Sequence, residues 1–235
     1  MRSLKRGAIN RLANNTIVMT KLFRCNLGLG DAIALSGAAV VLAERHGGLI
    51  FPCVKKYEVS VRSFFVGYPE IEVRDVATAS ELWNTDADCI QAAEEQIPPR
   101  CEIDHYRWLY QKLGVDYEER WARCPIRWSR VKVDQIPIPR DKYVFLHDDS
   151  NRKFMIDDSR VPRFYTLYAN PIEESILEFC HVIENADEVH VIDSAFFHLT
   201  EHLRPKGNLF LHRYARPYYP IWNDYLTRHQ WTILE

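Results

Sequence analysis

The sequence lacks a run of apolar residues long enough to cross a bilayer. Its most apolar stretch, Leu27 to Ala43, is interrupted by Asp31 and Ser36, whereas a membrane-spanning helix needs about 20 predominantly apolar residues. We expect a buried helix there and no integral membrane segment. The basic amino terminus, MRSLKRGAINRL, is not followed by the apolar core of a secretion signal. We therefore expect a cytoplasmic protein.

The sequence also lacks an excess of charge and any telling spacing of its cysteines. The 30 Lys and Arg residues nearly balance the 32 Asp and Glu residues, which gives no reason to expect a nucleic-acid partner. No C-x-x-C pair is present, so neither a disulfide framework nor a zinc site is expected. We expect reduced, partly buried thiols of an intracellular protein at Cys25, Cys53, Cys89, Cys101, Cys124 and Cys180.

Strand-like and helix-like segments alternate through the first half of the chain. Apolar or β-branched runs of strand length predict strands at 16–23, 49–54, 70–76 and 87–92. A helix is expected at 31–45, stopped by Gly47 and Gly48, and a second helical face is formed by Tyr57, Val61, Phe64 and Phe65. Alternation of this kind predicts a parallel sheet with helices on its faces.

The second half of the chain repeats this alternation after a different middle part. An amphipathic helix is expected from Tyr106 to Leu113, followed by a proline-containing crossing at 121–142. Further strands are predicted at 143–147, 163–168, 188–193, 208–212 and 230–234, with helices at 172–183 and 194–203. The expected fold is α/β, with two small Rossmann-like lobes, 1–120 and 143–235, whose parallel sheets face a cleft.

The stretch FRCNLGLGDAIALSGAAVVLAERHGG places a G-x-G-D pattern where a strand turns into a helix. In a parallel sheet this corner is the ligand edge, because the free N–H groups of the first helical turn attract anions. Gly28 and Gly30 have no Cβ, so a ligand has room beside Asn26 and Asp31. The alternative is a tight turn in which Asp31 caps the helix. The dinucleotide fingerprint and the P-loop are excluded, since a third glycine and a Lys-Ser/Thr pair are both absent.

A second strand-to-helix corner lies in NADEVHVIDSAFFHLTEHL, where Asp193 ends a strand and Ser194 opens a helix. Ser194 is placed to cap the helix while the N–H groups of its first turn hold a phosphate. His198 follows four residues later, on the same side of the helix. The alternative is that Asp193 and Ser194 are simple caps and His198 is a half-buried helix residue.

A loop rich in charge, FLHDDSNRKF, follows the strand at 143–147. Arg152 and Lys153 end it and are candidates for a diphosphate clamp, since Arg offers paired donors to phosphate oxygens. His147, Asp148 and Asp149 also invite a metal interpretation. Adjacent side chains rarely point the same way, however, and no third ligand stands at a telling spacing, so a solvated turn is the preferred role for the two acids.

The segment HRYARPYYPIWNDY, from His212 to Tyr225, is both aromatic and cationic. Aromatic faces of this kind pack against sugars and bases, but they also occur where a chain passes from surface to core. We prefer the structural interpretation.

The two corners together resemble one enzyme family. LGLGDAIALSGAAVVLAERHGG resembles the N-terminal loop and helix of heptosyltransferase-like glycosyltransferases, family 9 and relatives. VIENADEVHVIDSAFFHLTEHL resembles their C-terminal segment, in which Asn-Ala-Asp precedes a strand and Asp-Ser and His-Leu follow it. HDDSNRKF is faintly similar to the His-x-Arg stretch of GT-B fucosyltransferases. The chain departs from the family in its shorter length and in Ala195, where heptosyltransferases commonly have glycine.

The resemblance implies the two-lobed GT-B architecture and a glycosyltransferase that needs no cofactor and no bound metal. The donor would be a UDP- or GDP-linked sugar, bound by lobe 143–235, and the acceptor would be a glycan or another hydroxyl compound, bound by lobe 1–120. Asp31 would be the catalytic general base, with Asn26, Gly28 and Gly30 in the acceptor-side loop.

On the donor side, the resemblance assigns Asp193, Ser194 and His198 to the nucleotide site. We add Arg152 and Lys153 as the cations that stabilise the leaving diphosphate. Two alternatives stay open. A non-catalytic nucleotide-binding α/β protein would keep the corner at Ser194 but have no use for Asp31, and a hydrolase using His147, Asp148 and Asp149 would depend on a metal.

Overall fold

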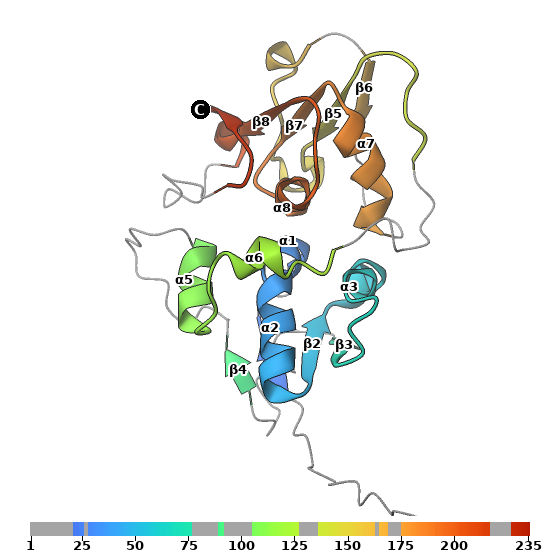
Figure 1. Cartoon of the computed structure of the whole chain (residues 1–235). Helices are drawn as coiled ribbons and strands as arrows, with labels where there is room; N and C mark the ends of the chain where they lie inside the picture. Colours follow the sequence, from blue (N-terminus) through green and yellow to red (C-terminus); the bar gives the residue numbers. More distant parts are fainter. Residues whose placement is uncertain are drawn as a thin grey trace, which may run out of the picture.

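The structure, a computed structural model, describes residues 21–25, 28–76, 89–91, 105–126, 136–162, 165–168, 175–216 and 227–235. Two parallel sheets build two lobes, which lie one above the other in Figure 1. The first lobe comprises the elements from β1 to α6, and the second comprises those from β5 to β9. The α/β class and the two parallel sheets predicted from the sequence are confirmed, and the arrangement is compatible with Rossmann-like lobes.

The first sheet has the strand order β3-β2-β1-β4, and all of its neighbours pair in parallel. Its strands are β1 (Lys21–Arg24), β2 (Leu49–Cys53), β3 (Ile71–Asp75) and β4 (Cys89–Gln91). The helical elements of this lobe are α1 (Leu29–Ala34), α2 (Ser36–His46), η1 (Lys55–Tyr57), α3 (Glu58–Phe64), α5 (His105–Lys112) and α6 (Glu119–Ala122).

The second sheet has the order β6-β5-β7-β8-β9 and is also parallel throughout. Its strands are β5 (Tyr143–His147), β6 (Tyr165–Tyr168), β7 (Glu188–Val191), β8 (Asn208–His212) and β9 (Trp231–Leu234). Its helical elements are η3 (Ser150–Arg152), η4 (Asp158–Arg160), η5 (Ile176–Phe179), α7 (Cys180–Asn185), α8 (Ala195–His202) and η6 (Arg213–Ala215).

Each sheet contains a point at which the chain reverses its direction of travel. In the first sheet the chain moves outward from β1 to β2 and β3, then returns to the other side of β1 for β4. In the second it moves from β5 to β6 and returns to the other side of β5 for β7. Ligands of open α/β sheets bind outside the carboxyl ends of the strands at such switch points. The loops after β1, β5 and β7 are therefore where a site is expected.

Small residues in α2 let other elements approach its backbone closely. Gly37 is fully inside the lobe, and a Cβ at this position would overlap the carbonyl oxygen of Glu119 and lie 3.0 Å from the Cα of Arg120. The hydroxyl of Tyr110, from α5, donates to the carbonyl oxygen of Ala34 and accepts from the N–H of Ala38. The helices α5 and α6 are thus fixed against the end of α2 that faces the second lobe (Figure 1).

The segment predicted as a helix at 31–45 is helical, but it is divided. Leu35 separates α1 from α2, and Gly47, with a φ of 71°, ends α2 in the left-handed conformation. The chief difference from the sequence prediction is α6, which extends into the segment assigned to the crossing. This helix is only one turn long, so it leaves no periodic pattern in the sequence. The predicted strand residues 16–20 and the crossing residues 127–135 lie outside the described residues.

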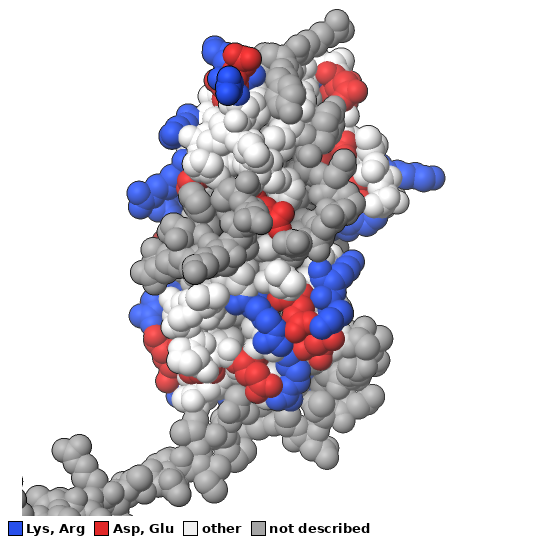
Figure 2. Space-filling model, turned by 90° about the vertical axis from the view of Figure 1, so that its right-hand side faces the viewer, with Lys and Arg blue, Asp and Glu red and all other residues white. Residues whose placement is uncertain are grey.

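Four of the cysteines, Cys25, Cys53, Cys124 and Cys180, are free and buried, as predicted. Among the described residues, no helix is long and apolar enough to span a membrane. Charges of both signs are interspersed on the face drawn in Figure 2. On α3, for example, Glu58 forms ion pairs with both Lys55 and Arg62.

Candidate functional site

The two lobes meet where α1 packs against α8 (Figure 1). A Cβ on Gly30 would lie 3.0 Å from Cδ2 of His198 and 3.5 Å from the backbone N of Ala195. Contacts shorter than about 3.4 Å are rare for real Cβ atoms, so a side chain here would require the neighbouring His198 to shift slightly. We expected the space at Gly30 to admit an acceptor. In the structure that space holds the first turn of α8.

Asp31 lies at this junction in the first turn of α1. Gly28 is the N-cap of α1, so the alternative that Asp31 caps the helix is wrong. A Cβ on Gly28 would lie 2.6 Å from Oδ2 of Asp31, which means that the missing side chain leaves room for the carboxylate. The other oxygen, Oδ1, accepts a hydrogen bond of 2.9 Å from the hydroxyl of Tyr106. Asn26, assigned to the same loop, lies outside the described residues.

Tyr106, in the first turn of α5, was not predicted as a site residue. Burial raises the pKa of its hydroxyl well above the usual value, and the nearby carboxylates of Asp31 and Asp193 add to the effect. The hydroxyl therefore stays protonated and acts as the donor in its bond to Asp31. Its ring also meets the imidazole of His198 edge to face, with centroids 4.9 Å apart. Tyr106 thus touches functional candidates from both lobes.

Arg120, from α6, is the buried cation of the junction, with only 3% of its surface exposed. Its Nη1 donates to the hydroxyl of Tyr117 at 2.7 Å, and its Nη2 lies 3.1 Å from Nδ1 of His198. The guanidinium also lies over aromatic rings, at 5.2 Å from the centroid of Tyr106 and 5.5 Å from that of Trp121. Arg120 was not predicted from the sequence, because an arginine beside a tryptophan in a one-turn helix has no distinctive pattern.

The contact with Arg120 fixes the protonation state of His198. A guanidinium has only donors, so Nδ1 of His198 must accept, and the neutral ring carries its proton on Nε2. Burial lowers the pKa of His198 well below its usual value, and the charge of Arg120 lowers it further. The Nε2 atom lies 4.0 Å from Oδ1 of Asp193. His198 therefore stands between a cation of the first lobe and a carboxylate of the second.

Ser194 caps α8, since its Oγ accepts from the N–H of Phe196 at 3.3 Å. The residue is 9% exposed and Asp193 is 8% exposed. The first turn of α8 is covered by α1, which places Gly30 beside the N–H of Ala195. A phosphate at this helix N-terminus consequently needs a relative movement of the two lobes.

The loop after β5 lies beside the same corner. Asp149 caps η3 and pairs with Arg152, whose Nε is 2.6 Å from Oδ2 of the carboxylate. This pairing helps to lower the pKa of Asp149 against the opposing effect of partial burial. Asp148 accepts from the N–H of Ile156 at 3.3 Å. Lys153 has a φ of 62° and ends the short helix. The acids thus serve the loop itself, while the side chain of Arg152 is half exposed.

Arg216 is a third residue near the site that was not predicted from the sequence. It follows η6, beyond the carboxyl end of β8, and its Nη1 donates to the carbonyl oxygen of Asp193. Its guanidinium lies 5.6 Å from the ring centroid of Phe154, and that of Arg152 lies 5.3 Å from the same ring. Two cations thus flank one aromatic ring beside the corner at Ser194.

The arrangement as a whole brings the two predicted corners together. Asp31 of the first lobe and Asp193, Ser194 and His198 of the second meet around Tyr106 and Arg120, so carboxylates, a neutral histidine and a cation share one junction. Such a set can accept a proton and stabilise negative charge. Within the described residues, no group of three or more His, Cys, Asp or Glu side chains is placed to hold a metal ion.

Comparison with known proteins does not identify a related site. No protein-family model, no curated protein and no solved structure matches the chain. The functional interpretation therefore depends on the chain's own residues.

Proposed function

We propose that the chain is a GT-B glycosyltransferase, which moves a sugar from a UDP- or GDP-linked donor to a hydroxyl acceptor. The observation that carries the proposal is the meeting of the two strand-to-helix corners across the lobe junction, with Gly30 of one against the first turn of α8 in the other. Both corners follow strands at the switch points of their sheets. A donor bound at one corner and an acceptor at the other would face each other across this junction.

Asp31 is the general base of the proposed reaction. The acceptor oxygen attacks the anomeric carbon, the bond from that carbon to the diphosphate oxygen breaks, and its electron pair leaves with the nucleoside diphosphate. The acceptor's proton passes to the carboxylate of Asp31. The hydrogen bond from Tyr106 holds this carboxylate in place, and a positioned base of this kind contributes about 10²- to 10⁴-fold to the rate.

The donor side supplies positive charge for the leaving diphosphate. The proposed hydrogen-bond donors to the diphosphate are the N–H groups at the start of α8, the hydroxyl of Ser194 and the guanidinium of Arg152. Lys153 is a weaker contributor. Because α1 covers the first turn of α8, the donor enters when the lobes separate. Closure around the bound donor then excludes water, whose attack is the competing reaction.

Two alternatives make different demands on the same residues. A non-catalytic nucleotide-binding protein would need the corner at Ser194 but no base at Asp31. A metal-dependent hydrolase would need Asp148 and Asp149 to turn toward a metal, whereas each accepts a hydrogen bond from a backbone N–H in its own loop. The hydrogen bonds favour the transferase over the hydrolase.

A thermal-shift screen against UDP, GDP, ADP, CMP and NAD, with and without EDTA, tests the proposal. We expect one uridine or guanosine diphosphate to raise the melting temperature, and EDTA to leave that rise unchanged. A protein that responds to no nucleotide, or only to a divalent metal, would contradict the transferase.

A further inference from the structure

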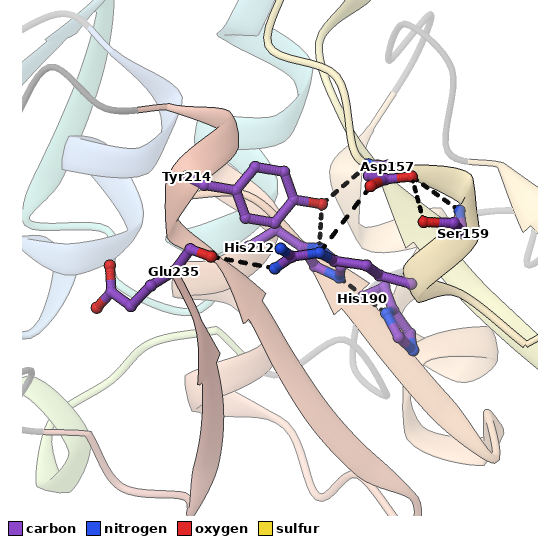
Figure 3. Close-up of polar contacts among 7 residues, drawn as sticks. Asp157, Ser159, His190, His212, Tyr214 and Glu235 are labelled. Atoms are coloured by element: carbon purple, nitrogen blue, oxygen red, sulfur yellow. Dashed lines mark hydrogen bonds and ion pairs between the residues drawn. The ribbon is translucent and has the colours of Figure 1, made fainter.

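A chain of hydrogen-bonded polar side chains lies on one face of the second sheet, apart from the lobe junction, and Figure 3 shows its members His190, His212 and Tyr214. It joins Glu188 and His190 of β7 to His212 at the end of β8 and to Tyr214 in η6. The distances are 2.8 Å from Oε2 of Glu188 to Nε2 of His190, 2.8 Å from Nδ1 of His190 to Nε2 of His212, and 3.0 Å from Nδ1 of His212 to the hydroxyl of Tyr214. Both histidines are buried.

The hydrogen bonds of this chain have only one consistent direction when both histidines are neutral. The N–H of Asp157 donates to the oxygen of Tyr214 at 2.9 Å, so the hydroxyl proton of Tyr214 is available for Nδ1 of His212. His212 then donates from Nε2 to Nδ1 of His190, and His190 donates from Nε2 to the carboxylate of Glu188. Every buried nitrogen in the chain is satisfied, which fixes the segment after β8.

Further contacts hold the same segment from outside. Arg160 lies over the ring of Tyr214, 4.6 Å from its centroid, and donates to the backbone oxygen of Glu235. Arg213 donates to the side chain of Glu235 at 3.0 Å. Figure 3 shows Tyr214 between the loop at Asp157 and the strand that carries His212. The residue that follows this anchored turn is Arg216.

We propose that Arg216, together with Arg152, binds the diphosphate of the sugar donor. Tyr214 and His212 hold the turn that positions Arg216. The inference rests on the proposed function and extends it to a residue outside the two corners. Arg152 follows β5 and Arg216 follows β8, so their guanidinium groups reach the switch point from either side of β7, and both flank Phe154. Paired guanidinium groups suit a diphosphate, because each offers forked donors to phosphate oxygens.

The contact of Arg216 with the carbonyl oxygen of Asp193 places the guanidinium where α8 begins. Its charge also helps to lower the pKa of His198, after burial and the effects of Arg120 and His202. A diphosphate at this place would therefore meet cations from two loops and the N-terminal N–H groups of α8. The anchoring by Tyr214 reduces the conformational entropy that Arg216 loses when the anion binds.

Isothermal titration of inorganic pyrophosphate and of UDP or GDP into four forms of the protein tests this inference. The forms are the wild type, Arg216→Gln, Arg216→Lys and the control Arg204→Gln, which removes an exposed cation beyond the carboxyl end of α8. We expect Arg216→Gln to weaken binding about tenfold or more, since hydrogen bonds to charged groups are strong. Arg216→Lys should lose less, and Arg204→Gln should bind like the wild type. Melting temperatures identify any variant that fails to fold, in which case Arg216→Lys carries the comparison.

The positioning role of Tyr214 is tested in the same titration. Tyr214→Phe should weaken pyrophosphate binding when Arg216 is present and have no further effect in an Arg216→Gln background, whereas a purely structural role would lower stability equally in both. Equal effects on binding in the two backgrounds would overturn that role.

The outcomes separate this inference from the proposed function. If the wild type binds a nucleoside diphosphate and Arg216→Gln binds it equally well, the inference is wrong and the transferase stands. If pyrophosphate binds through Arg216 but no nucleotide binds, the anion site stands and the transferase falls. Failure of the wild type to bind either ligand overturns both.

Discussion

Nη2 of Arg120 and Nδ1 of His198 lie 3.1 Å apart, although they come from different lobes and both residues are buried. The pair joins the first lobe to the helix that begins at Ser194. A buried donor or acceptor that loses its partner costs free energy, so this pair makes the position of the lobes depend on two specific side chains. It also places a cation of the first lobe at the proposed donor corner.

Removing the cation should destabilise the protein, and the effect should depend on His198. Arg120→Met leaves Nδ1 of the neutral His198 without this donor, and a buried acceptor left unsatisfied costs about 1–3 kcal/mol. We expect the double variant Arg120→Met/His198→Phe to lose less free energy of unfolding than the sum of the single variants, by about 1 kcal/mol or more. Strictly additive losses in urea denaturation would show that the two side chains act independently.

Gly37→Ala should disturb the same junction from a distance. The added Cβ would overlap the carbonyl oxygen of Glu119, so α6 must move and carry Arg120 with it. Overpacking of this kind costs about 1–3 kcal/mol, whereas Glu44→Ala, on the exposed side of α2, should cost less than about 1 kcal/mol. Thermal or urea unfolding of both variants measures this difference. Equal stability of the two would mean that the close approach of α6 is unimportant.

The histidine chain on the second sheet should make the protein sensitive to acid. Burial, with the nearby His190 and Arg160, lowers the pKa of His212 from 6.5 to about 4. Between these two pH values the unfolded chain binds the proton more readily than the folded one. The contribution of neutral His212 to the free energy of unfolding is therefore complete above about pH 6.5 and is lost as the pH falls toward about 4.

His212→Gln removes this titration. Between about pH 7 and about pH 4, its urea midpoint should fall less steeply than that of the wild type. The buried histidines that do not contact His212, such as His198, are common to both proteins, so their titration cancels in the comparison. Parallel pH profiles would count against neutral His212 as the cause.

The main elements of the fold were predictable from the sequence because they bury long apolar runs. The strands at 143–147 and 208–212 were predicted with the ends that the structure gives them. The two corners were also predictable, since glycine, Asp-Ser and the following helices are local patterns. By contrast, α6 is one turn long, and a single helical turn has no periodicity to detect.

The site could be predicted only in part, because its remaining members meet through tertiary packing. In the sequence, Tyr106 and Arg120 follow Asp31 by most of the length of the first lobe. No local pattern shows that the three residues converge in the fold. Arg216 lies in a segment whose composition favoured a structural role. Gly30 was predicted to leave room for a ligand, whereas the element that lies against it in the structure is α8 of the other lobe, which no local pattern shows.

The most direct test of the account is to compare wild type with Asp31→Asn, using the donor whose nucleotide the thermal-shift screen identifies. The substitution keeps the size of the side chain and its bond to Tyr106 but removes the base. We predict that Asp31→Asn binds the nucleoside diphosphate with unchanged affinity. In the presence of acceptor, the rate at which nucleoside diphosphate is released from the nucleotide sugar should fall about 10²- to 10⁴-fold. Asp141→Asn, at an exposed position in the crossing, serves as the control and should match the wild type. Undiminished turnover by Asp31→Asn would contradict the assignment of Asp31 as the base.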